Sequence, residues 1–217
     1  MQKKRDHCIR CGECCHKSSP TLHMEDLFLV KKGLVKRNHL YTIRKGEAVH
    51  DNVKGCVVNA RIEMIKVREG EEGGCIFFEE NGCACAIYEN RPVQCSALQC
   101  WDTRDFLEVY EGPKLDRHSA VDNEILMGLI EGHEKRCAYE TLEGQIRKIP
   151  AEGDKAIEEV LRMLQFDFEL RPMVVEKLGL LPEEVDFFFG RPLVDTIGMF
   201  GLKVVREPDG SFLLTKA

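Results

Sequence analysis

The sequence lacks the apolar runs that mark membrane and secreted proteins. Its longest apolar stretches, such as Ile125–Ile130, fall far short of the roughly 20 residues that cross a bilayer. The N-terminal segment MQKKRDHCIRCGECC starts basic, but charges and cysteines follow at once in place of the apolar core of a signal peptide. We therefore expect a cytoplasmic protein without a membrane partner. In that compartment thiols stay reduced, and dense cysteines indicate metal more often than disulfides.

Familiar nucleotide-binding and hydrolase motifs are also missing. The chain has no GxxxxGK[ST] phosphate loop, no GxGxxG after a strand, no GxSxG and no HExxH. With 31 basic and 37 acidic residues the formal charge is −6, which argues against a nucleic-acid partner held through phosphates. Hydrophobic content of 43% and charged content of 31% exclude wholesale disorder and fibrous structure. The remaining expectation is a globular protein with a redox partner or another protein partner.

Cysteine is the residue in excess, at 11 of 217 positions. Nine of these cysteines lie in two groups. The first cysteine group is Cys8, Cys11, Cys14 and Cys15, and the second is Cys75, Cys83, Cys85, Cys95 and Cys100. Charge changes after the second group: residues 1–100 carry 16 basic and 13 acidic residues, whereas residues 101–217 carry 15 and 24. We predict a cysteine-cluster metal-binding module over residues 1–100 and a mainly helical module over residues 101–217.

Two regular elements are expected in the first module besides a cysteine-bearing hairpin. Thr21 followed by Leu22–Lys32 and Gly33 predicts a short helix with a threonine cap. The β-branched residues of Val57–Val67 predict a strand. Cys56, at the start of that strand, is interpreted as a small buried apolar residue.

Helical periodicity dominates the second module. An apolar stripe over Asp122–Lys148 predicts one amphipathic helix, and Gly153–Leu170 predicts another. The pairs Arg171-Pro172 and Arg191-Pro192 predict the starts of two short helices. The segments Val204–Arg206 and Phe212–Leu214 predict a terminal hairpin. We therefore predict an α+β fold, in which a small, irregular, metal-stabilised cysteine module with a hairpin packs against a mainly helical C-terminal half that ends in a short hairpin.

The spacing Cys8-x-x-Cys11-x-x-Cys14 is the most informative motif. Structural zinc sites usually combine two Cys-x-x-Cys pairs from separate loops. Successive two-residue gaps instead match the opening of the bacterial ferredoxin motif, which binds iron–sulfur clusters. That motif needs a fourth cysteine three residues later, where this chain has Ser18. The fourth ligand is therefore expected from Cys15 or from the second cysteine group.

The hairpin predicted around Glu80-Asn81-Gly82 places the thiols of the second group. A three-residue loop with Gly82 left-handed would pair residue 79 with 83 and 77 with 85, so that Cys75, Cys83 and Cys85 share one face. A two-residue loop would pair residue 80 with 83 and would put Cys75 on the opposite face. We favour the three-residue loop because it brings three thiols together.

These cysteines also carry a family resemblance. Cys8-x-x-Cys11-Gly12-x-Cys14-Cys15, then Cys75-x-Phe77, then Cys85-x-Ile87-Tyr88-x-x-Arg91-Pro92-x-x-Cys95 resembles the YkgJ-type cysteine-cluster family of zinc- or iron-chelating proteins over residues 8–100. The resemblance implies that the chelating positions are Cys8, Cys11, Cys14, Cys15, Cys75, Cys85 and Cys95, with Cys100 as a further one. Cys83 is an extra cysteine outside the family pattern, and we count it with the others among the candidate metal ligands.

Three functions follow as hypotheses. The first is an iron–sulfur protein with at least one [4Fe–4S]-type cluster and a redox or cluster-assisted role, which would make it an oxidoreductase. The second is a non-catalytic interaction module stabilised by Zn²⁺. The third is a methyltransferase-like protein-modifying enzyme, because flagellin lysine-N-methylases resemble the family in the cysteine region.

Side chains outside the cysteine groups have weaker signals. Cations near the cysteines could offset thiolate charge, and Arg91 is the one assigned to cofactor binding; the others are Lys3, Lys4, Arg5, Arg10 and Lys17. His133 and Cys137 share a helical stripe and are interpreted as core residues before metal ligands. Exposure is expected of His7 and His16, and burial in the core of Phe187–Phe189.

Overall fold

The computed structural model of the protein describes residues 6–71 and 73–217. The chain forms two compact units, and each is discontinuous in sequence. The first unit comprises Met1–Tyr41 and Met64–Ala120, and the second comprises Thr42–Glu63 and Val121–Ala217. Residues 42–63 thus group with the C-terminal half, and residues 101–120 group with the cysteines. The sequence boundary near residue 101 stays a prediction about which segments fold independently.

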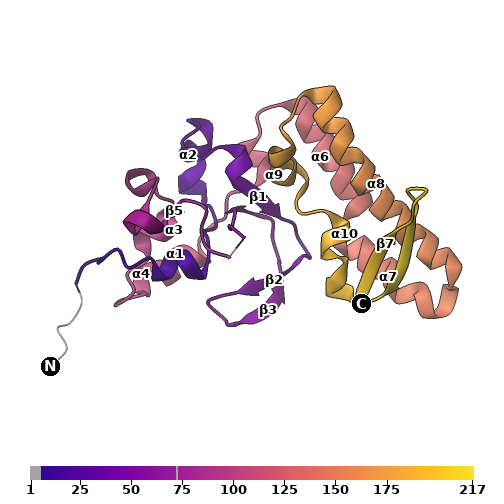
Figure 1. The fold of residues 1–217 in the computed structure, drawn as a ribbon, viewed down its shortest axis with the longest axis horizontal. Coiled ribbons are helices and arrows are strands. Elements are labelled where there is room, and N and C mark those ends of the chain that lie inside the picture. The colour runs from indigo at the N-terminus through magenta and orange to yellow at the C-terminus, as the bar shows by residue number, and fades with distance from the viewer. Residues whose placement is uncertain (1–5, 72) are drawn as a thin grey trace. The chain divides into compact units, whose positions relative to one another are not determined.

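The first unit consists of short elements joined by turns (Figure 1). Its helices are α1 (Glu13–Lys17), α2 (Leu27–Lys31), α3 (Val93–Ala97), α4 (Arg104–Glu111) and α5 (Arg117–Ala120), with 3₁₀ turns at Met24–Asp26, Arg37–His39, Glu80–Gly82 and Tyr88–Asn90. Antiparallel pairing joins β5 (Phe78–Glu79) to β6 (Ala84–Cys85). The strand β4 (Met64–Val67) also belongs to this unit, and β1 (Leu40–Ile43) begins in it.

Three distant segments meet in the apolar core of this unit. The amide of Leu22 donates to the carbonyl of Ile65 (2.8 Å), the amide of Ile65 donates to that of Leu115 (3.1 Å), and the amide of Leu115 donates to that of Leu22 (2.9 Å). All three side chains are fully buried. The core therefore lies beside the elements that carry the cysteines and ties residues 20–24 to residues 64–67 and 113–117.

The second unit is built around long helices (Figure 1). They are α6 (Glu124–Cys137), α7 (Tyr139–Glu152) and α8 (Asp154–Leu178), followed by α9 (Val185–Phe189) and α10 (Leu193–Thr196), with 3₁₀ turns at Pro182–Glu184 and Ile197–Phe200. Two hairpins complete the unit: β2 (Ala48–Asp51) pairs with β3 (Cys56–Asn59), and β7 (Leu202–Arg206) pairs with β8 (Phe212–Lys216).

The terminal hairpin, the helix start after Arg191-Pro192 and the buried Phe187–Phe189 segment confirm their predictions. Pro192 is the N-cap of α10, where its missing amide hydrogen costs nothing. The Arg171-Pro172 prediction was wrong. Pro172 lies inside α8, which continues to Leu178 because Leu170 and Val174 are both buried and hold the helix through the proline.

Two elements were predicted as continuous and are interrupted. The strand expected over Val57–Val67 is divided into β3 and β4, because β3 pairs with β2 while β4 pairs with β1. The helix expected over Asp122–Lys148 ends at Cys137, and Ala138 has an extended ψ of 135° before α7 begins. At this corner the carbonyl of Cys137 accepts a hydrogen bond from Arg44 Nη2 (2.6 Å), which replaces its bond within the helix.

The helix expected over Leu22–Lys32 begins later than Thr21 predicts. Thr21 forms an isolated bridge with Lys66, and Leu22 bonds to Ile65, so both residues are extended. The first turn starts after His23, whose amide donates to Asp26 Oδ2 (2.9 Å). Tertiary pairing therefore overrides the local cap signal.

Helices predominate in the C-terminal half, and the strands occur only as small antiparallel pairs, so the fold is α+β as predicted. Across the residues described, no helix combines the length and the apolar character needed to cross a bilayer. The 25-residue α8, for example, carries charged residues along its length.

Candidate metal centre

Thiols from both cysteine groups approach one another in the first unit. Cys14 and Cys15 lie on α1, Cys75 precedes β5, Cys85 ends β6 and Cys95 lies on α3. The amide of Cys75 donates to the carbonyl of Cys15 (2.8 Å), which joins the two groups directly. Cys14 Sγ and Cys15 Sγ are 4.0 Å apart. Cys95 is close enough to Cys14, Cys75 and Cys85 for their charges to act on it, and Cys75 and Cys95 act on Cys15 in the same way, so these five thiols belong to one neighbourhood.

A close contact at Gly12 positions α1. Gly12 is the N-cap of the helix and has a left-handed φ of 76°. A Cβ atom there would lie 2.3 Å from Cζ of Phe78, so only glycine lets the ring pack against this turn. The ring of Phe78 also contacts the ring of His16 at 4.6 Å between centroids. Phe78, at the start of β5, thus holds the first cysteine group against the second.

The turn before Cys75 is equally close to α1. A Cβ at Gly74 would lie 3.1 Å from the carbonyl oxygen of Cys15. The amide of Gly70 donates to the carbonyl of Gly74 (2.8 Å), and Glu69 forms an isolated antiparallel bridge with Cys75. This narrow turn delivers Cys75 to the end of α1.

Asp26 anchors the helix that carries Cys95, and sequence reasoning missed it. Its Oδ1 accepts a hydrogen bond from the amide of Val93 (2.8 Å), and its Oδ2 accepts one from the amide of His23 (2.9 Å). The carboxyl group is 2% exposed, and burial raises its pKa. The spacing His23-x-x-Asp26 is a local capping signal that a search for capping boxes could have found, but the bond to Val93 is tertiary.

The electrostatics of the five thiols are those of a crowded set of like groups. Burial first, and then the neighbouring thiols, raises the pKa of Cys95. Burial likewise raises the pKa of Cys75, with Cys85 contributing. The hydrogen bond between Cys14 and Cys15 lowers the pKa of Cys14 to about 6 and raises that of Cys15. At neutral pH most of these groups therefore hold protons that a metal would have to displace.

The donor chemistry fits a soft metal, because thiolates are the ligands that zinc and iron–sulfur clusters take. Over residues 6–71 and 73–217, however, no three His, Cys, Asp or Glu side chains converge closely enough to hold an ion. The thiols lie in one neighbourhood, but no three of these five sulfur atoms are close enough together to be ligands of a single metal ion. Metal binding would have to draw them closer.

The hairpin of the second cysteine group has a different register from the one we favoured. Phe78 pairs with Cys85 and Glu79 pairs with Ala84, which is the strand register of the two-residue alternative. The left-handed residue is Cys83, with a φ of 44°, and the 3₁₀ turn Glu80–Gly82 fills the loop. The prediction was wrong because Gly82 does not take the left-handed position, so the loop is longer than three residues.

This register separates Cys83 from the other thiols of its group. Cys83 is exposed, and its Sγ donates to the carbonyl of Glu80 (3.7 Å). The alternation of side chains along β5 does not extend to Cys75. The amide of Phe78 donates to the carbonyl of Cys75 (3.0 Å), which forms a turn between Cys75 and the strand. Cys75 and Cys85 are consequently close enough for each to influence the other electrostatically.

The remaining cysteines of the two groups are exposed, namely Cys8, Cys11 and Cys100. The amide of Arg10 lies 3.4 Å from Cys8 Sγ, and Arg10 has a left-handed φ of 55°. A backbone N–H aimed at sulfur is the kind of contact that stabilises a ligating thiolate. Their role as ligands stays a prediction.

Arg91, which the sequence assigned to cofactor binding, is held by its own turn. Its guanidinium stacks 4.1 Å from the centroid of Tyr88, and its Nη1 donates to the carbonyl of Tyr88 (2.8 Å). Arg10 contacts the same ring at 4.8 Å, so one tyrosine joins cations from both cysteine groups. Lys17 is exposed at the end of α1, and Lys3, Lys4 and Arg5 lie outside the described residues.

Three weaker sequence candidates, Cys56, His7 and His16, are exposed. Cys56 is exposed on β3, so the prediction that it is buried was wrong: its strand belongs to a two-stranded hairpin that leaves this residue at the surface. The predicted exposure of His7 and His16 is confirmed.

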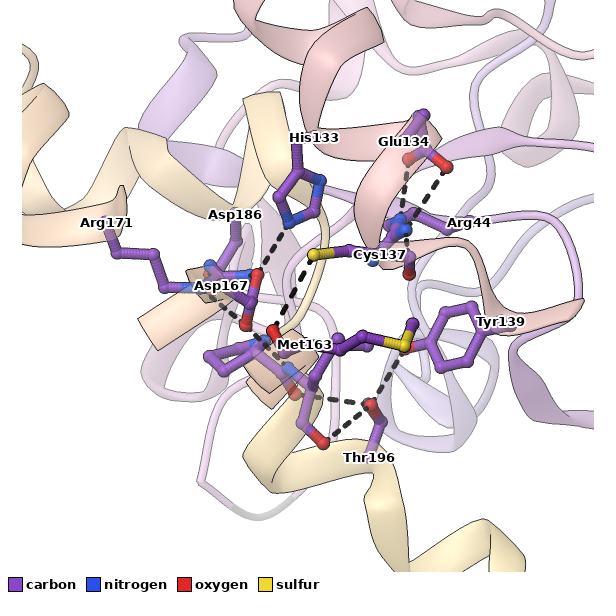
Figure 2. Close-up of polar contacts among 12 residues, drawn as sticks. Arg44, His133, Glu134, Cys137, Tyr139, Met163, Asp167, Arg171, Asp186 and Thr196 are labelled. Carbon is purple, nitrogen blue, oxygen red and sulfur yellow. Dashed lines mark hydrogen bonds and ion pairs between the residues drawn. The ribbon is translucent and has the colours of Figure 1, made fainter. Parts of the chain in front are cut away.

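His133 and Cys137 are core residues, as we favoured. Figure 2 shows His133 aimed at Asp167, with Nε2 2.7 Å from Oδ1, and both side chains are fully buried. Cys137 Sγ donates to the carbonyl of Met163 (3.8 Å), and burial raises the pKa of Cys137 to about 12. Cys137 thus packs in the apolar core of the second unit, with Leu142, Val160 and Leu164.

Asp167 is the centre of a buried polar cluster in the second unit (Figure 2). Besides His133, it accepts hydrogen bonds from Arg171 Nη2 (2.9 Å) and from the amide of Leu193 (2.8 Å). These partners outweigh burial and lower the pKa of Asp167 to about 2. Arg171 also pairs with Asp186 (3.1 Å), so the cluster fixes α6, α8, α9 and α10 together.

A second buried ion pair lies nearby in the same unit. Arg44 donates from Nε to Glu134 Oε1 (2.6 Å) and from Nη2 to Glu134 Oε2 (3.2 Å), and its side chain is fully buried (Figure 2). Burial alone would lower the pKa of Arg44, but the charge and the hydrogen bonds of Glu134 outweigh burial and raise that pKa. The cluster is thus built from opposite charges that neutralise one another.

Comparison with known proteins identifies the cysteine-bearing segment. Residues 7–114 match the family model CxxCxxCC, described as "Putative zinc- or iron-chelating domain". The matched segment spans both cysteine groups and the core strands between them. No curated protein and no solved structure matches the chain.

Proposed function

Because residues 7–114 place this chain in the CxxCxxCC family of zinc- or iron-chelating domains, we propose that its metal is an iron–sulfur cluster of the [4Fe–4S] type with a redox or cluster-assisted role. The observation that carries the proposal is the neighbourhood of five thiols from α1, β6, α3 and the turn before β5. Their segments are joined by the bond from the amide of Cys75 to the carbonyl of Cys15.

The ligands would come from Cys14, Cys15, Cys75, Cys85 and Cys95. Cys14 is the exposed member and the one with a lowered pKa, so it is the thiol best prepared to meet an incoming metal. Cys95 is held by the anchor at Asp26, and Cys75 is held by the narrow turn at Gly74. Cys8 and Cys11, on the exposed turn before α1, would close over the centre from the N-terminal side.

An iron–sulfur cluster supplies one-electron chemistry or a Lewis-acidic iron when it is bound. The chain's own contribution is to hold these partly buried thiols near one another, most of them protonated in the metal-free state. Backbone amides, such as that of Arg10 near Cys8 Sγ, would stabilise negative sulfur. Arg10 and Arg91, stacked on Tyr88, place positive charge near the same segments.

The test is metal analysis of the full chain purified without oxygen. We expect a brown protein with inorganic sulfide and a broad absorption near roughly 400 nm, where thiolate-to-iron charge transfer falls. A colourless protein with bound zinc would overturn the iron–sulfur assignment and leave metal binding intact. A Cys15→Ser variant is expected to lose metal, and a Cys56→Ser variant is the matched control because Cys56 lies on β3 of the second unit.

A further inference from the structure

The exposed turn of the first cysteine group, residues 8–11, is joined to the second group by two cations stacked on one ring. The guanidinium of Arg10 lies 4.8 Å from the centroid of the Tyr88 ring, and the guanidinium of Arg91 lies 4.1 Å from the same centroid. The residues of this turn are all exposed, so burial does not hold it in place. The contact between Arg10 and Tyr88 is therefore a tether between the two groups.

Arg10 contacts a thiol and the ring at the same time. Its amide lies 3.4 Å from Cys8 Sγ, while its guanidinium reaches Tyr88. Its φ of 55° is in the left-handed region, which costs free energy for a residue with a side chain and persists only where contacts hold it. The ring contact is one that the side chain supplies. The backbone that aims an N–H at Cys8 is thus coupled to the Tyr88 ring.

Tyr88 is itself fixed within the second cysteine group. It begins a 3₁₀ turn three residues after Cys85. The amide of Ala86 donates to the carbonyl of Phe77 (2.8 Å), and Arg91 Nη1 donates to the carbonyl of Tyr88 (2.8 Å). Arg91 therefore binds this tyrosine through both its ring and its backbone. The ring is a fixed platform for a cation from the first group.

We propose that Tyr88 is a positioning residue of the metal centre, whose ring binds Arg10 and so keeps the two thiols of the exposed turn available to the metal that the second cysteine group binds. This inference rests on the proposed function. It explains how Cys8 and Cys11, which burial does not hold, can serve as ligands. The family description assigns no role to a tyrosine or to stacked cations.

The experiment measures the Kd of Zn²⁺ for the full chain in its reduced, metal-free form, with a competing chelator. Tyr88→Leu removes the ring and is expected to weaken binding about 3- to 10-fold, the size of one partly exposed cation–π contact. Tyr88→Phe keeps a ring face for both cations and should bind within about twofold of the wild-type chain. Tyr110→Leu is the matched control and should bind as the wild-type chain does. Its ring carries Lys114 at 5.3 Å, in the segment 101–120, which has no cysteine.

Arg10→Asn tests the route from the ring to the thiols. Asparagine tolerates the left-handed conformation better than most residues, so the turn keeps its backbone while it loses the guanidinium. We expect the same loss of affinity as in Tyr88→Leu, and no further loss when the two substitutions are combined, because both break one contact. If Arg10 acted only through its charge, the two losses would add.

Unchanged binding in Tyr88→Leu would overturn the inference, and so would additive losses in the double variant. Equal losses in Tyr88→Leu and Tyr88→Phe would also overturn it, since the contact needs only the ring, and an equal loss in Tyr110→Leu would assign the effect to the stability of the unit. If a chain with Cys8→Ser and Cys11→Ser bound zinc as tightly as the wild-type chain, the exposed turn would supply no ligand. The inference would then fail while the proposed function stood on the other thiols. If the wild-type chain bound neither zinc nor iron, the proposed function itself would fail.

Discussion

The two units bury titratable groups in opposite ways. In the second unit, Asp167 lies between His133 and Arg171, and Arg44 lies against Glu134. Each buried charge there has a partner of opposite sign or a strong donor. In the first unit, five thiols lie near one another, and neighbouring thiols contribute to the raised pKa values of Cys15 and Cys95.

The difference shows which of the two clusters has all its charges balanced by other residues of the chain. A buried ion pair whose hydrogen bonds are satisfied needs no bound ion to balance its charges. Like groups that raise one another's pKa stay protonated and neutral until a metal cation displaces their protons. The second unit therefore carries its countercharges in its sequence, whereas the first unit is built to receive them from a metal.

The largest expected effect comes from breaking the finished cluster. Asp167→Ala removes the acceptor of His133, Arg171 and the Leu193 amide at a fully buried position, so it should lower the free energy of unfolding by about 3–5 kcal/mol. Urea denaturation of the second unit's helices measures it. Glu159→Ala, which removes an exposed partner of Arg162, is the control and should cost at most about 1 kcal/mol. Equal losses in the two variants would contradict the comparison.

Metal removal should affect the first unit alone. A metal present at about 100 times its Kd stabilises the folded state by about 2.7 kcal/mol, and a chelator removes that contribution. We expect faster hydrogen exchange of amides near Cys75 and Cys95 after chelation, with exchange in α8 unchanged. Equal acceleration in both units would show that metal is not confined to the thiol cluster.

A smaller effect is expected from filling the contact at Gly12. Gly12→Ala places a methyl group 2.3 Å from Cζ of Phe78 and should cost about 1–3 kcal/mol beyond the backbone strain of a left-handed alanine. Gly55→Ala isolates that strain, because Gly55 has a φ of 66° and no atom within 4 Å of its Cβ position. Thermal unfolding of both variants gives the difference. If the two variants lost the same stability, the Phe78 contact would not hold α1.

Lowering the pH should affect the two units through different titrating groups: His133 and Asp167 in the second unit, and the cysteine thiols in the first. Burial lowers the pKa of His133, so the unfolded chain takes up this proton first and the second unit loses stability as pH falls below about 6.5, by at most about 1.4 kcal/mol per pH unit. Asp167, with a pKa of about 2, adds a further loss only as pH falls from about 4 toward 2. Urea midpoints between pH 7 and 5 measure the first effect, and His133→Gln should flatten the slope.

In the first unit the raised pKa values of Cys15, Cys75 and Cys95 predict that metal uptake strengthens as pH rises, since fewer protons remain to be displaced. Zinc titrations at pH 6 to 8 test this expectation. Uptake that did not depend on pH would mean that the thiols already bind as thiolates in the metal-free protein.

Sequence patterns predicted correctly the elements that are held together by contacts between residues close in the chain. The terminal hairpin, the helix after Arg191-Pro192 and the helical character of residues 122–178 all follow from turn chemistry and periodicity. The predictions were wrong where the backbone conformation depends on a residue far away in the sequence. Ala138 interrupts a helical stripe because Arg44 binds the preceding carbonyl, and Thr21 is extended because Lys66 lies opposite it.

The amino-acid sequence by itself determined that this chain is a cysteine-cluster protein, because the spacing of thiols is a property of neighbours along the chain. Only the tertiary structure decided which thiols meet, that Asp26 holds the helix of Cys95, and that the ammonium group of Lys66 bonds to Ser19. Those relations depend on hydrogen bonds between residues that are tens of positions apart, and no local pattern records the partner of a buried carboxyl group or ammonium group.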